Sequence, residues 1–172
     1  MLPKKLQDKI DARARDSSLR SLGFRQDLID FSSNDYLGFS RSKEIYNKAC
    51  SILKQHNYQA NGATGSRLLT ANHPLYLDTE KQIATFHKTP SALIFNSGYD
   101  ANIGFFSSVP QRGDVILYDA LCHASIRDGI AMSHAKGHKF AHNNLQGLEA
   151  LLEAQNTPGK IRPEIYVVTE DV

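Results

Sequence analysis

Residues 115–129 read VILYDALCHASIRDG and place two reactive side chains, Cys122 and His123, where an apolar run gives way to a helix-like run. The apolar run 115–118 is typical of a buried strand. In open α/β sheets, ligands bind outside the carboxyl ends of the strands, and a histidine there offers a flat ring and hydrogen bonds. The alternative is a histidine that caps the helix or packs in the core, which is the commoner case for an isolated residue. His123 is therefore a candidate whose role depends on its neighbours.

A nucleophile–base pair and a metal site are both disfavoured by the local pattern. Consecutive side chains such as Cys122 and His123 usually diverge, and nothing identifies a third residue that orients a base. His134, His138 and His142 are spaced four apart, as metal ligands on one helix would be. A glycine and the strand-like KFAH interrupt that helix, and no carboxylate or thiolate completes a ligand set. We predict no metal site and solvent-facing histidines.

A second candidate is FNSGYDAN (95–102), where a strand-like run meets a helix start at Ser97 and Gly98. Unpaired N–H groups and the helix dipole favour phosphate at a helix N-terminus, and glycine permits a close approach. The stretch matches neither GxGxxG nor GxxxxGK[ST], the usual nucleotide-binding fingerprints. A plain turn and a phosphate site both remain open here, one βα unit before His123.

The stretch 59–74, QANGATGSRLLTANHP, is a long loop with glycines and no apolar period. Within it, Gly62, Gly65, Ser66 and Arg67 offer donors for an anionic substrate. The alternative is a plain connection between two helices. The length of the loop and its small polar residues favour a function.

The elements that must position these residues alternate along the second half of the chain. A surface helix or arm is expected over 4–20, a short strand at the start of 28–39, and helices over 43–57, capped by Ser42, and 74–88. Beyond residue 91 we expect strands in SALIFNSG, DVILYD, KGHKFAH and PEIYVVTED, and helices in YDANIGFFSSV, HASIRDGIAMSHA and NLQGLEALLEA. This alternation predicts an α/β fold, a mostly parallel sheet with helices on both faces.

The last strand, with the continuous apolar run 165–168, is expected to be central and buried on both sides. The chain stops four residues later, with no helix to cover that strand. We therefore interpret the 172-residue chain as the first part of a longer protein.

Composition excludes several classes of protein. The chain is 41% hydrophobic and 22% charged, and its net charge of +2 favours neither nucleic acid nor an anionic membrane. It has no signal-peptide core and no run of about 18 apolar residues. Two separate cysteines, Cys50 and Cys122, suit a reducing compartment better than a disulfide framework. We expect a soluble, cytoplasmic protein.

Several sequence blocks occur together and in order in one known family. FSSNDYLG, GATGSRLLTAN, NSGYDAN, DALCHASIRDG, FAHNN and YVVTED resemble the pyridoxal-phosphate-dependent α-oxoamine synthases, and the match covers residues 17–172. FSSNDYLG and the DALxHAS pattern are the most specific of these blocks. The resemblance implies the N-terminal part of a fold-type I transferase. Residues 1–40 would form an arm and a first short strand, and residues 41–172 the first part of the large cofactor-binding domain, truncated after a central strand.

The resemblance also implies a cofactor site for pyridoxal 5'-phosphate. Gly98 and Tyr99 match the main-chain groups that hold the cofactor phosphate at a helix start. His123 matches the histidine that stacks over the pyridine ring and helps to place the substrate. The matching region stops before the segments that carry the family's pyridinium-binding aspartate and Schiff-base lysine, so no lysine is assigned.

For the substrates, the resemblance implies three further residues. Arg20 matches an arginine that meets the distal carboxylate of the acyl donor. Asn34 and Ser66 match polar positions of the substrate cleft, Ser66 from the partner subunit of a homodimer. One departure is Thr70-Ala71, where the family has Ser-Gly, and it can alter the local turn.

The implied reaction joins an amino acid to an acyl thioester with loss of CO₂, and the cofactor ring serves as the electron sink. FSSNDYLG and Arg20 favour the biotin-synthesis branch, which joins pimeloyl-CoA or a pimeloyl carrier protein to alanine. SIRDGI and YDAN look closer to the glycine C-acetyltransferase branch, and GATGSRLL suggests the serine palmitoyltransferase branch. An alternative of another functional class is that the 172-residue chain is an inactive fragment or a binding remnant, because the lysine region is absent.

Overall fold

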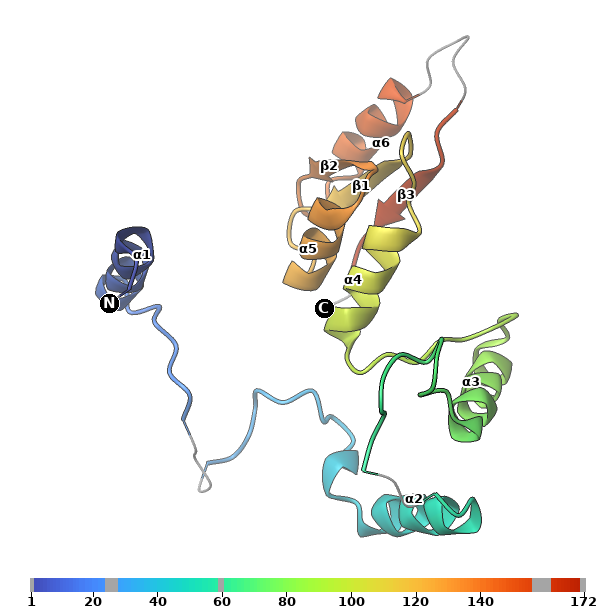
Figure 1. Cartoon of the computed structure of the whole chain (residues 1–172). Helices are drawn as coiled ribbons and strands as arrows, with labels where there is room; N and C mark the ends of the chain where they lie inside the picture. Colours follow the sequence, from blue (N-terminus) through green and yellow to red (C-terminus); the bar gives the residue numbers. More distant parts are fainter. Residues whose placement is uncertain (1, 24–27, 59–60, 156–161, 171–172) are drawn as a thin grey trace. The chain divides into compact units, whose positions relative to one another are not determined.

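The computed structural model describes residues 2–23, 28–58, 61–155 and 162–170 (Figure 1). The chain divides into two compact units, residues 1–62 and residues 63–172, and each has its own elements. Within the described residues, no helix combines the length and the apolar character needed to cross a membrane.

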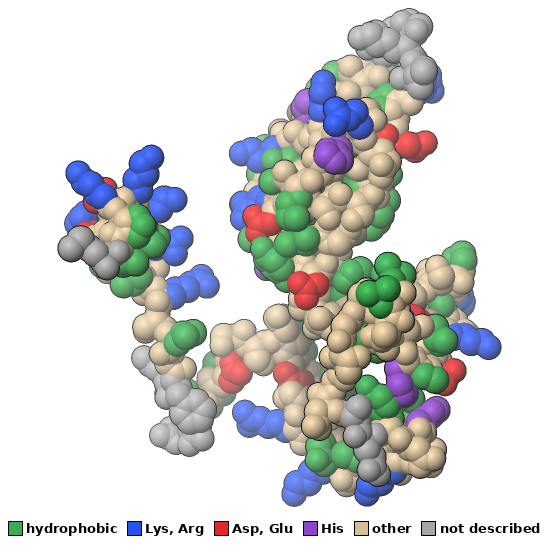
Figure 2. Space-filling model, viewed as in Figure 1, with side chains coloured by type: hydrophobic (Ala, Val, Ile, Leu, Met, Phe, Trp, Pro, Cys, Tyr) green, Lys and Arg blue, Asp and Glu red, His purple; other side chains and the backbone are tan. Residues whose placement is uncertain are grey.

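The first unit contains α1 (Lys4–Arg15), a short 3₁₀ helix (Phe39–Arg41) and α2 (Lys43–Gln55). The predicted surface helix is confirmed, because α1 has no buried residue, and Figure 2 shows its Lys and Arg side chains standing out from it. It ends five residues earlier than expected. Ser17 adopts a left-handed φ of 53°, which a helix does not continue through.

The capped helix of this unit is confirmed and its strand is not. Ser42 Oγ accepts a hydrogen bond of 3.3 Å from the Ile45 N–H, as its N-cap position predicts. The short strand expected at the start of residues 28–39 is wrong, since the described residues there form bends and turns. The Asp30 carboxylate accepts the Ser32 and Ser33 N–H groups, so this backbone bonds locally instead of in a ladder.

The second unit begins with α3 (Pro74–His87) and continues as an α/β layer structure. Its elements, in order, are α4 (Gly98–Ser108), β1 (Val115–Asp119), α5 (Ala124–Met132), β2 (Lys136–Phe140), α6 (Leu145–Ala154) and β3 (Ile165–Val168). Both β2 and β3 pair in parallel with β1, which gives the order β2-β1-β3. The predicted alternation of strands and helices around a parallel sheet is confirmed.

Helices cover both faces of this sheet, with α4 and α5 on one side and α6 on the other (Figure 1). Alternate side chains of β1 supply the two cores. Ile116 packs with Phe106 of α4 and with Ile126 of α5, while Leu117 packs with Phe140 beside α6. Both β1 side chains are fully buried, so β1 is the centre of the fold.

The pairing bears on two of the predicted strands. Within the described residues β3 pairs with β1, and Ile165 and Val167 are 37% and 48% exposed. The central position expected for the run 165–168 in a longer protein stays a prediction. SALIFNSG forms no strand, because within the described residues no second strand lies beside it. The Ile94 N–H instead donates to the Glu80 carboxylate at 2.9 Å.

Glu80 anchors the segment before α4 through an ion pair with Arg67. The two guanidinium contacts measure 2.6 and 2.9 Å, and Asn72 Oδ1 accepts from the same guanidinium. Arg67 also lies over the Tyr76 ring at 4.3 Å. Arg67 is therefore engaged with Glu80 and Asn72 inside this unit, and its expected role toward an anionic substrate stays a prediction.

This ion pair predicts an acid-sensitive part of the stability. Hydrogen bonds from the Arg67 guanidinium, and then from the Ile94 N–H, lower the pKa of Glu80 from 4.5 to about 2. A carboxyl group with a lowered pKa in the folded state stabilises the fold above its ordinary value and loses that contribution as the pH falls. We expect urea unfolding at a series of pH values to show this loss between about pH 4.5 and pH 2, and to show less of it in Glu80→Gln.

The double variant Arg67→Gln with Glu80→Gln is the control for this prediction. It is expected to show the same reduced pH dependence as Glu80→Gln alone, since either change breaks the pair. An undiminished loss of stability in Glu80→Gln would assign the acid sensitivity to other carboxyl groups.

Candidate functional site

The carboxyl end of β1 is built around a buried carboxylate, Asp119, which is 3% exposed. It accepts the Leu121 N–H at 2.7 Å, contacts His142 Nδ1 at 3.0 Å and accepts the Asn143 N–H at 3.1 Å. The Leu121 N–H is the main cause that holds the pKa of Asp119 below its ordinary value, and His142 adds to it. Asp119 thereby joins the loop before α5 to the loop that follows β2.

His123 lies at the end of the Asp119 loop and caps α5. Its Nδ1 accepts the Ser125 N–H at 3.2 Å, and its own backbone N–H donates to the Glu170 carboxylate from the segment after β3. The residue is exposed, so its ring is accessible at the carboxyl edge of the sheet. The segment after β3 thus meets the backbone of His123, while the segment after β2 meets Asp119 at the end of β1.

Behind the ring, two polar side chains connect His123 to α4. Ser125 Oγ lies 2.7 Å from His123 Nδ1, and Asn102 Nδ2 donates to Ser125 Oγ at 2.9 Å. Ser125 is fully buried, which places this contact inside the junction of α4 and α5. Gly129 allows the two helices to approach, because a Cβ there would lie 3.0 Å from the Asn102 carbonyl oxygen.

The start of α4 has the features of an anion site. Ser97 Oγ caps the helix by accepting the Asp100 N–H at 3.0 Å. Within the described residues, the Gly98 and Tyr99 N–H groups make no hydrogen bond, and the space where a Gly98 side chain would stand is open. The Tyr99 hydroxyl donates to Asp128 of α5 at 2.7 Å, which raises the pKa of this hydroxyl. These contacts hold the starts of α4 and α5 side by side.

The structure separates the sequence-predicted site residues into two groups. Gly98, Tyr99 and His123 lie at the starts of α4 and α5, in the second unit. Ser66 belongs to the same unit, where its hydroxyl accepts the Leu68 N–H at 3.2 Å. Arg20 and Asn34 lie in exposed, irregular segments of the first unit. Their proposed roles are taken up below.

Cys122 is not arranged as a nucleophile. It is 3% exposed and packs in the core cluster with Ile116 and Ile126. Burial raises the pKa of its thiol, which disfavours the reactive thiolate. The sequence-based rejection of a Cys122–His123 pair agrees with this environment.

The three histidines spaced four apart do not lie on one helix. His138 lies in β2 and His142 follows that strand, so they do not share a helix face. The described part of the chain contains no group of three or more metal-ligating side chains. The pairing of His142 with Asp119 was missed from the sequence, where His142 was treated as solvent-facing.

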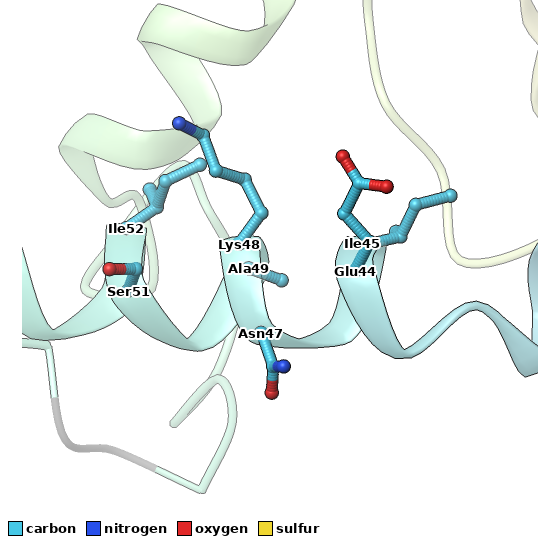
Figure 3. A pocket seen from close by; sticks show the side chains of 7 residues that line it. All are labelled: Glu44, Ile45, Asn47, Lys48, Ala49, Ser51 and Ile52. Atoms are coloured by element: carbon cyan, nitrogen blue, oxygen red, sulfur yellow. The ribbon is translucent and has the colours of Figure 1, made fainter.

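A separate hollow lies on α2 in the first unit (Figure 3). All the residues that line it come from one helix: Glu44, Ile45, Asn47, Lys48, Ala49, Ser51 and Ile52. It contains none of the predicted site residues, and it is an open helix face with mixed polar and apolar side chains. The candidate site therefore remains the carboxyl edge of the sheet in the second unit.

The layered parallel sheet and the paired helix starts at its carboxyl edge define an α/β protein with a ligand site at the strand ends. Residues 26–169 match the family described as Aminotransferase class I and II. The chain belongs to this family, and its fold is that of the first part of a fold-type I transferase. Pyridoxal phosphate is the cofactor that this membership assigns.

The relatives and solved structures agree with this assignment. The 8-amino-7-oxononanoate synthase of Emericella nidulans is 47% identical over 75% of this chain and 32% of its own length. A serine palmitoyltransferase of Sphingomonas wittichii is 29% identical with a TM-score of 0.66, covering 77% of this chain and 32% of that one. An 8-amino-7-oxononanoate synthase of Francisella tularensis is 28% identical with a TM-score of 0.56, covering 78% and 35%. The chain spans about a third of the length of such relatives.

The residues at the carboxyl edge fit the phosphate and the ring of this cofactor. The Gly98 and Tyr99 N–H groups make no hydrogen bond within the described residues, they lie at the start of an 11-residue helix, and the space where a Gly98 side chain would stand is open, as phosphate binding there requires. The exposed His123 ring stands at the start of the neighbouring helix. Nothing in these contacts obstructs a phosphate at Gly98.

Proposed function

We propose that the protein carrying this chain is an α-oxoamine synthase, 8-amino-7-oxononanoate synthase, which condenses alanine with a pimeloyl thioester in biotin synthesis. The observation that carries the proposal is the pairing, at one sheet edge, of a helix start with free N–H groups and an exposed histidine ring. The 47% identity to a relative of this name favours the biotin branch over the other two.

The proposed roles follow from the contacts of each residue. The Gly98 and Tyr99 N–H groups donate to the cofactor phosphate, and the bond from Tyr99 to Asp128 keeps this helix start in place. His123 forms one wall of the slot for the cofactor ring and orients the substrate. Aromatic stacking of this kind contributes about 0.5–1.5 kcal/mol beyond area burial, so its larger effect is on orientation. When bound, the cofactor supplies an electron sink for the amino acid.

The substrate residues and the assembly belong to the same proposal. Arg20 meets the far carboxylate of the pimeloyl donor, and Asn34 lines the substrate cleft. Ser66 enters the cleft of the partner subunit in a cytoplasmic homodimer. We also propose that residues 1–172 alone lack turnover, because none of their lysines matches the lysine that anchors the cofactor in this family.

A substrate comparison tests the proposed reaction. The protein carrying this chain is purified with pyridoxal phosphate and assayed with three pairs: alanine with pimeloyl-CoA, glycine with acetyl-CoA, and serine with palmitoyl-CoA. We expect the highest kcat/KM with the first pair, and CO₂ release that depends on both substrates. A higher kcat/KM with either other pair would assign the protein to that branch, and no turnover with any pair would overturn the proposal.

Arg20→Ala tests the proposed contact between Arg20 and the far carboxylate of the acyl donor. Charge-assisted hydrogen bonds from arginine to a carboxylate are strong, roughly 1.5–3 kcal/mol each, which corresponds to about a 10- to 100-fold rise in KM. We expect this rise for pimeloyl-CoA and little change for heptanoyl-CoA, which lacks the far carboxylate. Arg13→Ala, which removes an exposed arginine from α1, is the matched control. Equal effects of Arg20→Ala on both donors would reject the role.

A further inference from the structure

We infer that Asn102 and Ser125 are positioning residues that determine which ring nitrogen of His123 carries the proton. The inference rests on the proposed function for its catalytic meaning, since it concerns the hydrogen bond that His123 offers to a bound ligand. Ser125 is fully buried and Asn102 is half-buried. Both act through the Nδ1 side of the His123 ring.

Asn102, Ser125 and His123 form a chain of hydrogen bonds that runs from Asn102 to His123. Asn102 Nδ2 donates to Ser125 Oγ at 2.9 Å, and Ser125 Oγ lies 2.7 Å from His123 Nδ1. The Ser125 backbone N–H points to the same nitrogen at 3.2 Å. Ser125 is fully buried, so its hydroxyl has no water as an alternative partner.

The donors and acceptors of these groups decide the position of the proton. An amide NH₂ group only donates, so Ser125 Oγ accepts from Asn102 and directs its own proton to His123. A backbone N–H also only donates. His123 Nδ1 therefore accepts from both groups of Ser125 and carries no proton, which leaves the ring proton on Nε2.

The consequence for the site is a hydrogen-bond donor on the exposed side of the ring. Within the described residues, His123 Nε2 has no partner, so its N–H is available to an acceptor atom of a bound ligand. A ring with the opposite tautomer would present an acceptor there and would repel the same ligand atom. Asn102 and Ser125 thus set the hydrogen-bonding character of His123 Nε2.

Asn102→Asp tests the inference, because it reverses the direction of these hydrogen bonds and changes the side-chain shape little. A carboxylate only accepts, so the Ser125 hydroxyl would donate to residue 102 and accept from His123 Nδ1. ¹⁵N NMR of the histidine-labelled, cofactor-free protein at alkaline pH reports the protonation of each ring nitrogen, and His123→Gln assigns the signals. We expect the Nε2–H form in the wild type and a larger share of the Nδ1–H form in Asn102→Asp, where the Ser125 backbone N–H is the one remaining group of the three that favours an acceptor at Nδ1.

Asn144→Asp is the matched control, because it makes the same change at the N-cap of α6, where aspartate caps equally well. It is expected to leave the His123 signals unchanged. Ser125→Ala is a second variant that keeps the helix and removes the hydroxyl, and it is expected to populate both tautomers. A wild-type Nδ1–H form, or His123 signals unchanged in both Asn102→Asp and Ser125→Ala, would overturn the inference.

Kinetics give the second readout. With cofactor bound, Asn102→Asp and Ser125→Ala are expected to lower kcat/KM about 10- to 100-fold, as loss of a partner that orients a histidine does elsewhere. The NMR result needs no turnover, so the two proposals fail separately. Shifted tautomers without activity on any substrate pair would keep the inference and reject the proposed function. Unshifted tautomers would reject the inference whatever the activity.

Discussion

Replacing His123 by asparagine is expected to lower kcat/KM for amino ketone formation by about 100-fold or more while the protein stays folded. The ring is proposed to orient the cofactor and substrate, and misplacement by about 1 Å can cost about 100-fold in rate. Asparagine is a good N-cap residue, so it preserves the start of α5, which His123 now caps. His123→Ala would lose the ring and also the cap, at a cost of about 1 kcal/mol in stability.

The comparison of these two variants separates catalysis from folding. Both should lose activity to a similar extent, whereas only His123→Ala should unfold at lower urea concentration. Cys122→Ala is the neighbouring control and should retain kcat/KM, since the thiol is buried and its pKa is raised. Full activity in His123→Asn, or its loss in Cys122→Ala at unchanged stability, would reject the assigned roles.

Elements that depend on local patterns could be predicted from the sequence. The helix start at Ser42 follows from its cap residue, whose side chain accepts the expected backbone N–H, and the helix start after Ser97 follows from the Ser-Gly turn. The strand β1 follows from its apolar run, and its position before His123 placed that residue at the sheet edge. In such segments, side-chain chemistry and backbone preference act within a few residues of each other.

The sequence-based prediction of strands is weakest where a strand depends on a partner that is distant in the sequence. The runs at the start of 28–39 and at 91–95 have strand-like composition, yet neither has a strand beside it among the described residues. The run 165–168 is apolar throughout, and among the described residues its strand partner is β1, so the central position expected for it stays a prediction. Hydrophobicity indicates that a strand can be buried, and only the pairing decides whether it is.

The candidate site likewise contains residues that the sequence indicates and contacts that it does not. His123, Gly98 and Tyr99 could be named because a strand end or a helix start marks them in the sequence. The contacts of Asp119 with His142 and of Asn102 with Ser125 each join residues 23 positions apart. A buried aspartate at the end of an apolar strand was the available signal for the first contact. The second has no sequence signal of its own, because it depends on how closely α4 approaches α5.

Leu117→Ala is expected to lower the free energy of unfolding of the 172-residue chain by about 2–5 kcal/mol, the range for truncating a buried leucine. Leu117 is fully buried in the central strand, between β2 and β3 and against the α6 side of the sheet. Its truncation leaves a cavity that three parallel strands in register cannot readily collapse. Urea unfolding monitored by circular dichroism measures the loss.

Val167→Ala is the matched control for Leu117→Ala, because Val167 is the register partner of Leu117 on β3 and faces the same side of the sheet. It is 48% exposed, since the contacts of α6 in this core are with β1 and β2. Its truncation removes little buried surface, so the expected loss is about 0.5 kcal/mol or less. A loss as large as that of Leu117→Ala would contradict the exposure of Val167 in the 172-residue chain.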